Sequence, residues 1–269
     1  MIDKIKFSVI IPCFNDGLRI RRAVESCLTQ SYPPYEVIII DDGSGTFTKD
    51  AIQSIIRQYS TRNVKGFFLT DNSGVSVARN KGLDIATGDF ICFLDSDDVW
   101  HPEKLHIIDT FLKKEKGTFS LSHDFTYDLR EFTTIKPDLG KKMEYKTISF
   151  IHLLLKNPIT TPSLIIPGYL KIRFNEKMKF AEDHDFILRL SRLTEVLFIN
   201  SKLAFINRRL GSKGGLSENS WKMRKGELKM YLFFCRTNPK FYFLLPLLTV
   251  YSLIKHLRYL ILKKYLFSK

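Results

Sequence analysis

The sequence predicts an α/β fold with a Rossmann-like first half on a parallel sheet, a second half on a mixed sheet, and a helical tail. Up to about residue 118, short apolar runs alternate with segments of helical spacing. Strands and helices that alternate in this way indicate right-handed βαβ crossovers, which build parallel sheets. From residue 119 the alternation is irregular, and this favours a mixed sheet. Residues 221–269 are basic and rich in large apolar side chains.

Four apolar runs are expected to be the strands of the first half. Their residues are mostly β-branched or aromatic, as in strands buried on both faces. The expected strands are Phe7–Pro12, Glu36–Ile40, Lys65–Leu69 and Phe90–Leu94, and the expected helices are Asp16–Gln30, Ala51–Tyr59, Gly74–Ala86 and Pro102–Lys114. The first turn, Pro12–Gly17, has no G-x-G-x-x-G, which argues against a dinucleotide-binding protein.

The second half is expected to contain fewer helices, and they are less regularly placed. We expect strands at Phe119–Leu129, Ser163–Ile166 and Val196–Asn207, a polar loop at Lys136–Lys146, a short helix at Ile148–Leu155 and an amphipathic helix at Glu182–Leu193. A second function can reside in this half. We therefore divide the chain into a main domain of residues 1–220, with halves 1–118 and 119–220, and a tail of residues 221–269.

The positive charge of the chain is concentrated near its end. The sequence of 269 residues has a net charge of +14. Residues 1–200 hold 27 Lys and Arg against 26 Asp and Glu, whereas residues 201–269 hold 15 against 2. A basic segment of this kind indicates binding to nucleic acid or to an anionic membrane surface.

The apolar residues of the tail favour the membrane over nucleic acid. Phe241–Ile254 has 14 residues and no charge, which is too few for a helix that spans a bilayer, and Pro246 is expected to kink it. Residues 255–267 then mix Lys and Arg with Leu, Ile, Tyr and Phe, as in a helix that lies among lipid headgroups. The alternative is a tail whose apolar face packs on the core or on a partner subunit.

The cysteines and the start of the chain bear on the compartment. Cys13, Cys27, Cys92 and Cys235 are widely spaced and form no C-x-x-C pair, which predicts buried free thiols in a reducing compartment. No signal peptide is expected, because residues 1–6 are charged and the first apolar stretch is short.

Three carboxylates follow the fourth expected strand. Asp95, Asp97 and Asp98 lie where a parallel strand leaves its sheet, which is the edge where α/β proteins bind ligands. Like charges so close repel each other unless a cation lies among them. Mg²⁺ and Mn²⁺ prefer oxygen ligands and often bind the phosphates of a substrate as well. The alternative is a polar turn whose aspartates cap the helix that follows.

Four segments together resemble the family 2 glycosyltransferases, which have the fold called GT-A. They are FSVIIPCFN (7–15), EVIIIDDGS (36–44), GVSVARNKGLDIATGDFICFLDSDD (74–98) and AEDHDFILRL (181–190). Each segment alone is a weak signal, but the four in this order are specific. The resemblance covers residues 5–210 and implies a GT-A fold, with acceptor binding in the second half.

The resemblance also implies roles for individual residues. It places Pro12, Phe14, Asp42, Arg79 and Asp95 at the nucleotide sugar, with Phe14 beside the nucleobase and Asp42 on the base or ribose. An aromatic face can stack on a base, and a carboxylate can accept its N–H or a ribose hydroxyl. For Arg79 a surface salt bridge is an equally good interpretation.

The metal and the base are implied in the same way. Asp95 and Asp97 match the Asp-x-Asp of the family, which serves the divalent metal, with Asp98 as an auxiliary candidate. Asp183 matches the general base. Its alternative role is helix capping, because acidic side chains in a first turn suit the helix dipole.

One departure from the family concerns a Tyr-Arg-x-His motif near the last core strand. Here Leu210 stands at the histidine position, which puts a histidine contact to the diphosphate or metal in doubt. Arg208, Arg209 or Lys213 can supply positive charge instead.

Together these features predict a metal-dependent inverting glycosyltransferase. It would use Mg²⁺ or Mn²⁺ and a nucleotide-diphosphate sugar, a UDP-sugar first of all, and transfer the sugar to a saccharide or lipid-linked acceptor in cell-surface polysaccharide synthesis. We expect it in the cytoplasm, peripheral on the inner membrane, with no nucleic-acid partner. The alternative is a non-catalytic sugar-nucleotide-binding or scaffolding protein of the same fold.

Overall fold

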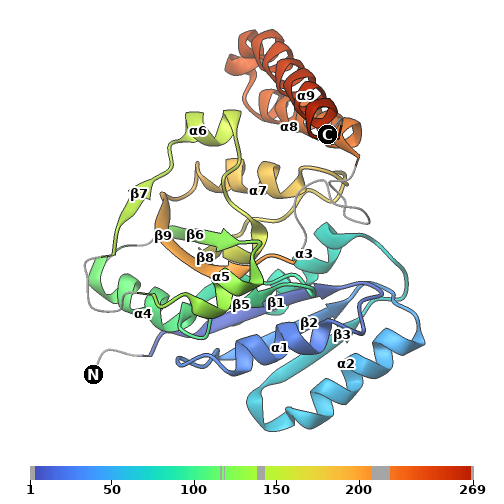
Figure 1. Cartoon of the computed structure of the whole chain (residues 1–269), viewed down its shortest axis with the longest axis vertical. Helices are drawn as coiled ribbons and strands as arrows, with labels where there is room; N and C mark the ends of the chain where they lie inside the picture. The colour runs from blue at the N-terminus through green and yellow to red at the C-terminus, as the bar shows by residue number, and fades with distance from the viewer. Residues whose placement is uncertain (1–3, 116, 118, 138–142, 208–218, 268–269) are drawn as a thin grey trace.

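The computed structural model describes residues 4–115, 117, 119–137, 143–207 and 219–267, and its centre is one large sheet (Figure 1). The strand order is β3-β2-β1-β4-β8-β6-β9-β5, and β7 pairs with β9 beside this path. Helices lie on both faces of the first half of the sheet, and a pair of helices, α8 and α9, lies at one end of the molecule.

The first half is the parallel βαβ array that the sequence predicts. β2 and β4 pair in parallel with β1, and β3 pairs in parallel with β2. The elements are β1 (Phe7–Cys13), α1 (Ile20–Leu28), β2 (Glu36–Asp41), α2 (Thr46–Gln58), β3 (Val64–Phe68), α3 (Val75–Ile85), β4 (Phe90–Phe93) and α4 (Lys104–Glu115). The short strand β5 (Val99–Trp100) lies between β4 and α4 in the sequence but pairs antiparallel with β9 in the second half of the sheet.

The second half mixes strand directions, as expected. β8 is antiparallel to β4 and β6, while β6 and β9 are parallel with an irregular register near Asp124. The elements are β6 (Ser120–Thr126), α5 (Leu129–Thr134), β7 (Tyr145–Thr147), α6 (Phe150–Leu155), β8 (Ile165–Pro167), α7 (Glu182–Leu190) and β9 (Val196–Phe205).

Several predicted boundaries need correction. The strand expected at Phe119–Leu129 ends at Thr126, because Asp128 accepts the N–H groups of Arg130 and Glu131 and so begins α5. The loop expected at Lys136–Lys146 ends in strand β7, and residues 138–142 lie outside the described residues. The first helix begins at Ile20, four residues later than expected.

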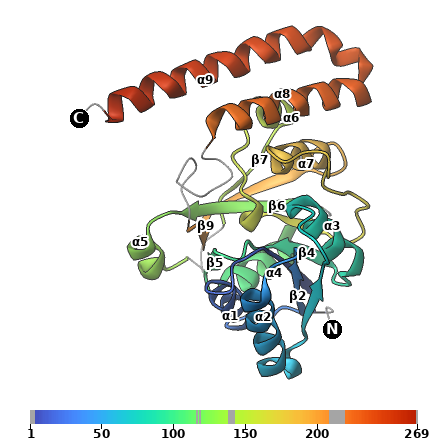
Figure 2. The same cartoon turned by 90° about the vertical axis from the view of Figure 1, so that its right-hand side faces the viewer.

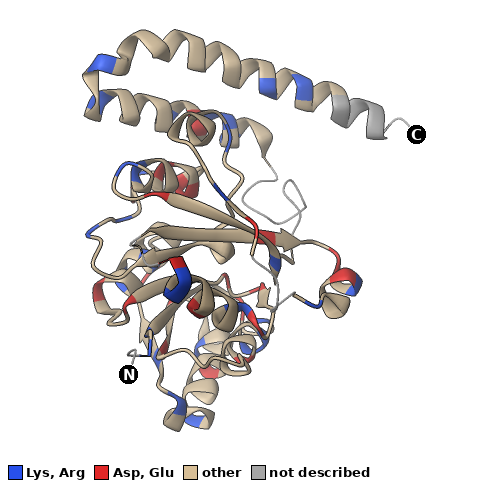
Figure 3. Ribbon diagram, turned by 90° about the vertical axis from the view of Figure 1, so that its left-hand side faces the viewer, with Lys and Arg blue, Asp and Glu red and all other residues tan. Residues whose placement is uncertain are grey.

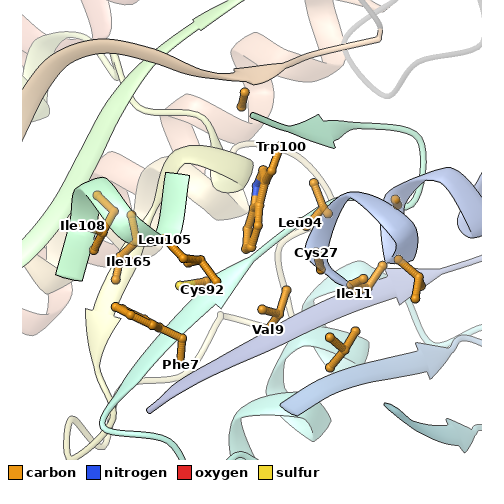
Figure 4. Close-up of a cluster of buried hydrophobic side chains, with 14 of the residues drawn as sticks. Phe7, Val9, Ile11, Cys27, Cys92, Leu94, Trp100, Leu105, Ile108 and Ile165 are labelled. Carbon is orange, nitrogen blue, oxygen red and sulfur yellow. The ribbon is translucent and has the colours of Figure 1, made fainter. Parts of the chain in front are cut away.

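Side chains that alternate along β1 divide the core into layers. Phe7, Val9 and Ile11 point toward α1 and α4, where they pack with Cys92 and Trp100 (Figure 4). Ile10 points to the other face. All four cysteines are buried and free, as predicted.

The tail forms a helical hairpin over the second half of the main domain. α8 (Ser220–Thr237) lies against α7, and α9 (Leu245–Phe267) runs back along α8 and extends beyond it (Figure 2). Met230, Tyr231 and Phe234 of α8 are buried in the same core cluster as α7. The alternative of a tail that packs on the core therefore holds for α8.

α9 corrects two expectations for the tail. Pro246 is the second residue of α9, and a proline in the first turn of a helix removes no hydrogen bond, so the expected kink is wrong. The apolar helical stretch also runs from Pro239 to Ile261, 23 residues that are long and apolar enough to cross a membrane. The uncharged run of 14 residues gave too short a length for this stretch, because the helix continues past Lys255 and its residues there are still largely apolar.

Candidate functional site

Three neighbouring parallel strands end at the same edge of the sheet, and the predicted donor-binding residues follow them. Phe14 follows β1, Asp42 follows β2, and Asp95 comes shortly after β4. Since β2 and β4 both pair with β1, these residues come together at the carboxyl edge. The structure thus brings the three predicted donor-binding residues to one edge of the sheet.

The candidate residues at the ends of β1 and β2 differ in solvent exposure. Phe14 is 46% exposed, so its ring can meet a ligand. Pro12 is buried within β1. Asp42 is buried and accepts the N–H groups of Ser73 (2.8 Å) and Gly74 (2.9 Å), which fixes the start of α3. Burial raises the pKa of Asp42, and these two hydrogen bonds oppose the shift.

The three carboxylates after β4 have different surroundings. Asp95 is partly exposed and accepts a hydrogen bond from Arg79 at 2.8 Å. Asp97 lies 3.5 Å from the guanidinium of Arg19. Asp98 is buried and accepts the N–H of Asn207 at 2.9 Å.

The closeness of these carboxylates shows in the pKa of Asp98. Burial raises the pKa of Asp98 to about 8, and the negative charges of Asp95 and Asp97 contribute to the shift. A cation at this place would relieve the repulsion. In the described part of the chain, no three His, Cys, Asp or Glu side chains form a metal site by themselves. Two carboxylates fit Mg²⁺ or Mn²⁺ when substrate phosphates supply the other ligands.

Arg79 joins this cluster to a segment more than one hundred residues away. Its guanidinium contacts Asp95 at 2.8 Å and Glu182 at 3.4 Å, and it lies 5.2 Å from the centre of the Phe174 ring. Arg79 is only 4% exposed and Glu182 is buried with it, so the interpretation of Arg79 as a surface salt bridge is wrong, although its second partner, Asp95, is partly exposed. Burial lowers the pKa of Arg79, but the charges of Asp95, Glu182 and Asp183 together raise it above its ordinary value.

The two acidic residues at the start of α7 differ in exposure. Glu182 is buried, whereas Asp183 is partly exposed. Burial and, after it, the charge of Asp183 raise the pKa of Glu182 to about 7, and the charge of Arg79 opposes this shift. The Asp183 carboxylate accepts from the side-chain amide of Asn157 at 3.4 Å. The cap position of α7 is Ala181, so Asp183 lies in the first turn and does not cap the helix by its side chain.

Sequence reasoning missed several members of the site. Glu182 was identified only as an acidic residue of a first turn, and the structure places it on Arg79. Arg19 and Arg22 of the first helical segment contact Asp97, Arg22 through the backbone carbonyl at 3.2 Å. The sequence offered one signal for this pair: Arg19 and Arg22 are three residues apart, and this spacing puts two side chains on the same face of a helix. Leu210 and its basic neighbours Arg208, Arg209 and Lys213 lie outside the described residues.

This geometry agrees with the comparison to known families. The family described as Glycosyl transferase family 2 matches residues 8–162, which is more than half of the chain. The chain belongs to glycosyltransferase family 2. The matched range contains the carboxyl edge with Asp42, Arg79, Asp95 and Asp97, whereas Asp183 lies beyond it.

Curated members of the family show similarity over parts of the chain. The amylovoran biosynthesis glycosyltransferase AmsB of Erwinia amylovora is 29% identical over 196 residues, 70% of this chain and 65% of that protein. TuaG of Bacillus subtilis, a glycosyltransferase assigned to teichuronic acid biosynthesis, is 40% identical over 117 residues, 43% of this chain. The chain spans 65% of the length of AmsB and 45% of that of TuaG.

Similarity to solved structures confirms the GT-A-like fold. TarS of S. aureus in complex with UDP-GlcNAc superimposes with a TM-score of 0.66 at 22% identity, over 86% of this chain and 66% of that one. A mannosyltransferase from Pyrobaculum calidifontis, in complex with GDP-Man and Mn²⁺, gives a TM-score of 0.64 at 15% identity, over 94% of this chain and 74% of that one.

Proposed function

We propose that the protein is a nucleotide-sugar glycosyltransferase whose donor binds at the carboxyl edge of β1, β2 and β4. The observation that carries the proposal is the buried cluster at Arg79, where Asp95 after β4 meets Glu182 and Asp183 at the start of α7. Arg79 thus links the donor-side carboxylate Asp95 to the first turn of the helix that carries the candidate base Asp183. Membership in glycosyltransferase family 2 supports this activity.

The donor is proposed to be a UDP-sugar. The exposed ring of Phe14 offers a face on which a base can stack, and Asp42 and Pro12 lie at the same edge. TarS, of similar fold, binds UDP-GlcNAc, and the mannosyltransferase binds GDP-Man. These complexes support a nucleotide sugar as the ligand class.

Asp95 and Asp97 are proposed to hold Mg²⁺ or Mn²⁺ together with the donor diphosphate. Such an ion stabilises the negative charge that develops on the departing nucleoside diphosphate. Asp95 is suited to this role because it remains partly exposed while Arg79 fixes one of its oxygens. Arg19 beside Asp97 offers a second positive charge at the same edge.

Asp183 is proposed to be the general base of an inverting reaction. Glu182 is buried and engaged by Arg79, so Asp183 is the carboxylate of this pair that an acceptor can reach. Asp183 would remove the proton of the acceptor hydroxyl, which attacks the anomeric carbon from the side opposite the leaving group. We assign one base and no nucleophile among the residues that the structure describes at this site, and a single displacement of this kind inverts the configuration.

The acceptor is proposed to be a lipid-linked saccharide of a cell-surface polysaccharide, met at the cytoplasmic face of the inner membrane. AmsB and TuaG are named for polysaccharide biosynthesis. α9 supports a peripheral attachment, because Leu253, Leu257 and Leu260 are exposed along it. The Lys255 ammonium donates to the buried Glu227 of α8 and to the Leu155 carbonyl at 3.0 Å, so α9 is held lengthwise on α8.

Nucleotide-sugar hydrolysis with and without Mn²⁺ tests the activity. We expect Mn²⁺-dependent release of UDP from at least one donor in a panel followed by mass spectrometry. If a donor binds but none is turned over, with or without acceptor, the protein is the non-catalytic binding protein of the same fold.

Membrane attachment is tested by sedimentation with anionic vesicles. Changing Leu253, Leu257 and Leu260 to Gln should release the protein into the supernatant. The matched control changes Leu18, Leu129 and Leu193, which are also exposed but lie outside the tail, and should sediment as wild type. Equal sedimentation of both variants would refute the attachment through α9.

A further inference from the structure

Five lysines surround one cavity between the segment before α7 and the first half of α8. The cavity has a volume of about 340 Å³, which is within the usual size of a ligand site. The lysines are Lys177, Lys179, Lys222, Lys225 and Lys229, and all five are exposed. None of the residues proposed to bind the donor lines this cavity.

The charge of these lysines is not neutralised by neighbouring acids. None of the five forms a salt bridge with any residue that the structure describes. The acidic residue of α8, Glu227, is buried and accepts from Arg224 and Lys255. The ribbon of α8 and α9 accordingly carries Lys and Arg with almost no Asp or Glu (Figure 3). Several ammonium groups at one cavity favour a ligand with several negative charges.

A glycine brings the two groups of lysines together. A Cβ on Gly226 would lie 2.5 Å from the carbonyl oxygen of Phe180, so only glycine lets α8 approach this segment so closely. As a result Lys222 lies over the ring of Phe180, with its ammonium 6.0 Å from the ring centre. The cavity is therefore formed by close packing of two segments that are distant in sequence.

The lining of the cavity is apolar as well as basic. Met178 is buried and Phe180 is half-buried, and both lie between the lysines. Lysine binds phosphate as a point charge, without the bidentate geometry that arginine offers to planar carboxylates. A cavity that combines five ammonium groups with two apolar side chains suits a phosphate group attached to an apolar chain.

One residue that lines the cavity, Phe180, is close to the proposed base in the sequence. Phe180 precedes Asp183 by three residues, so their Cα atoms are at most about 11 Å apart. An acceptor whose hydroxyl lies at Asp183 can therefore place a neighbouring group in the cavity. From these observations we infer that the cavity binds the diphosphate of a lipid-linked acceptor. This inference rests on the proposed function, since it assigns the acceptor of the same site.

The test is titration calorimetry with farnesyl diphosphate and, separately, with inorganic diphosphate at low salt. Changing Lys222, Lys225 and Lys229 to Gln should weaken the binding of both probes by roughly tenfold or more, since the change removes three of the five positive charges at the cavity. The matched control changes Lys81, Lys114 and Lys136 to Gln. These are exposed, lie outside the cavity and remove the same charge, so the control should bind as wild type.

Thermal unfolding of both variants establishes that they are folded, and two further outcomes decide the inference. Equal binding of both diphosphates by the two variants would overturn it. Loss of sedimentation with phosphatidylglycerol vesicles while diphosphate binding persists would also overturn it, and would assign the lysines to the bilayer surface. Binding of UDP-GlcNAc by wild-type protein, titrated in the same series, tests the proposed function separately.

Discussion

Replacing Arg79 with Met should destabilise the protein more than any exposed ion-pair change. The variant leaves the buried Glu182 without its cation and removes the 2.8 Å contact to Asp95. Removing one partner of a buried ion pair typically costs about 3–5 kcal/mol of unfolding free energy. Glu182 can reduce this cost by taking a proton, because its pKa is already raised to about 7 by burial. We therefore expect a loss of about 3 kcal/mol at pH 7.

The dependence on pH follows from the same contact. Arg79 lowers the pKa of Glu182 against the effect of burial, so its removal raises that pKa further. Folding then favours the protonated form more strongly, and the deficit of the variant should grow as the pH rises through 7 and shrink toward pH 5.

Urea denaturation of matched variants measures this effect. The control is Arg173→Met, which breaks the exposed 2.7 Å pair with Asp84 and should cost only about 0–1 kcal/mol. Arg79→Lys keeps the charge but loses the planar guanidinium, and should lie between the two. If Arg79→Met loses no more stability than Arg173→Met, the buried cluster does not hold the two segments together.

Three further predictions concern other parts of the molecule. Asp183→Asn should lower kcat, measured by steady-state kinetics, by about 10²-fold or more. Donor affinity, measured by calorimetry, should change little. Near-normal turnover would leave Asp183 only a helix-dipole role. Burial lowers the pKa of Lys104 to about 7, so the wild-type unfolding free energy should rise between pH 7 and 10. Lys104→Met should lack this rise in urea denaturation. Gly226→Ala should lower the melting temperature, because the new Cβ meets the Phe180 carbonyl at 2.5 Å, and an unchanged value would contradict that close packing.

Much of the first half could be predicted because its signals are local. The apolar runs of β1 and β2 are buried on both faces, and their carboxyl ends carry Phe14 and Asp42 within a few residues. The parallel register then brings these residues together without further information. The strands and the place of these two candidate residues at the sheet edge were therefore predictable from the same short segments.

The features that the sequence did not predict depend on contacts between segments that are distant in the chain. The pair of Arg79 and Glu182 joins residues more than one hundred positions apart, and no local pattern distinguishes it from a surface salt bridge. β5 has two residues, Val99–Trp100, and exists because β9 pairs with it. The tail was treated as one amphipathic unit, yet α8 is buried against α7 while α9 is largely exposed.

The most direct measurement of the central claim is a calorimetric titration of UDP-GlcNAc into wild-type protein and the Asp97→Asn variant, each with and without Mn²⁺. An Asp50→Asn variant, changed at an exposed aspartate of α2, serves as the control. The account predicts that Mn²⁺ strengthens binding to wild type and control but not to Asp97→Asn, because that substitution removes charge where the cation must bind. An equal gain from Mn²⁺ in all three proteins would contradict it.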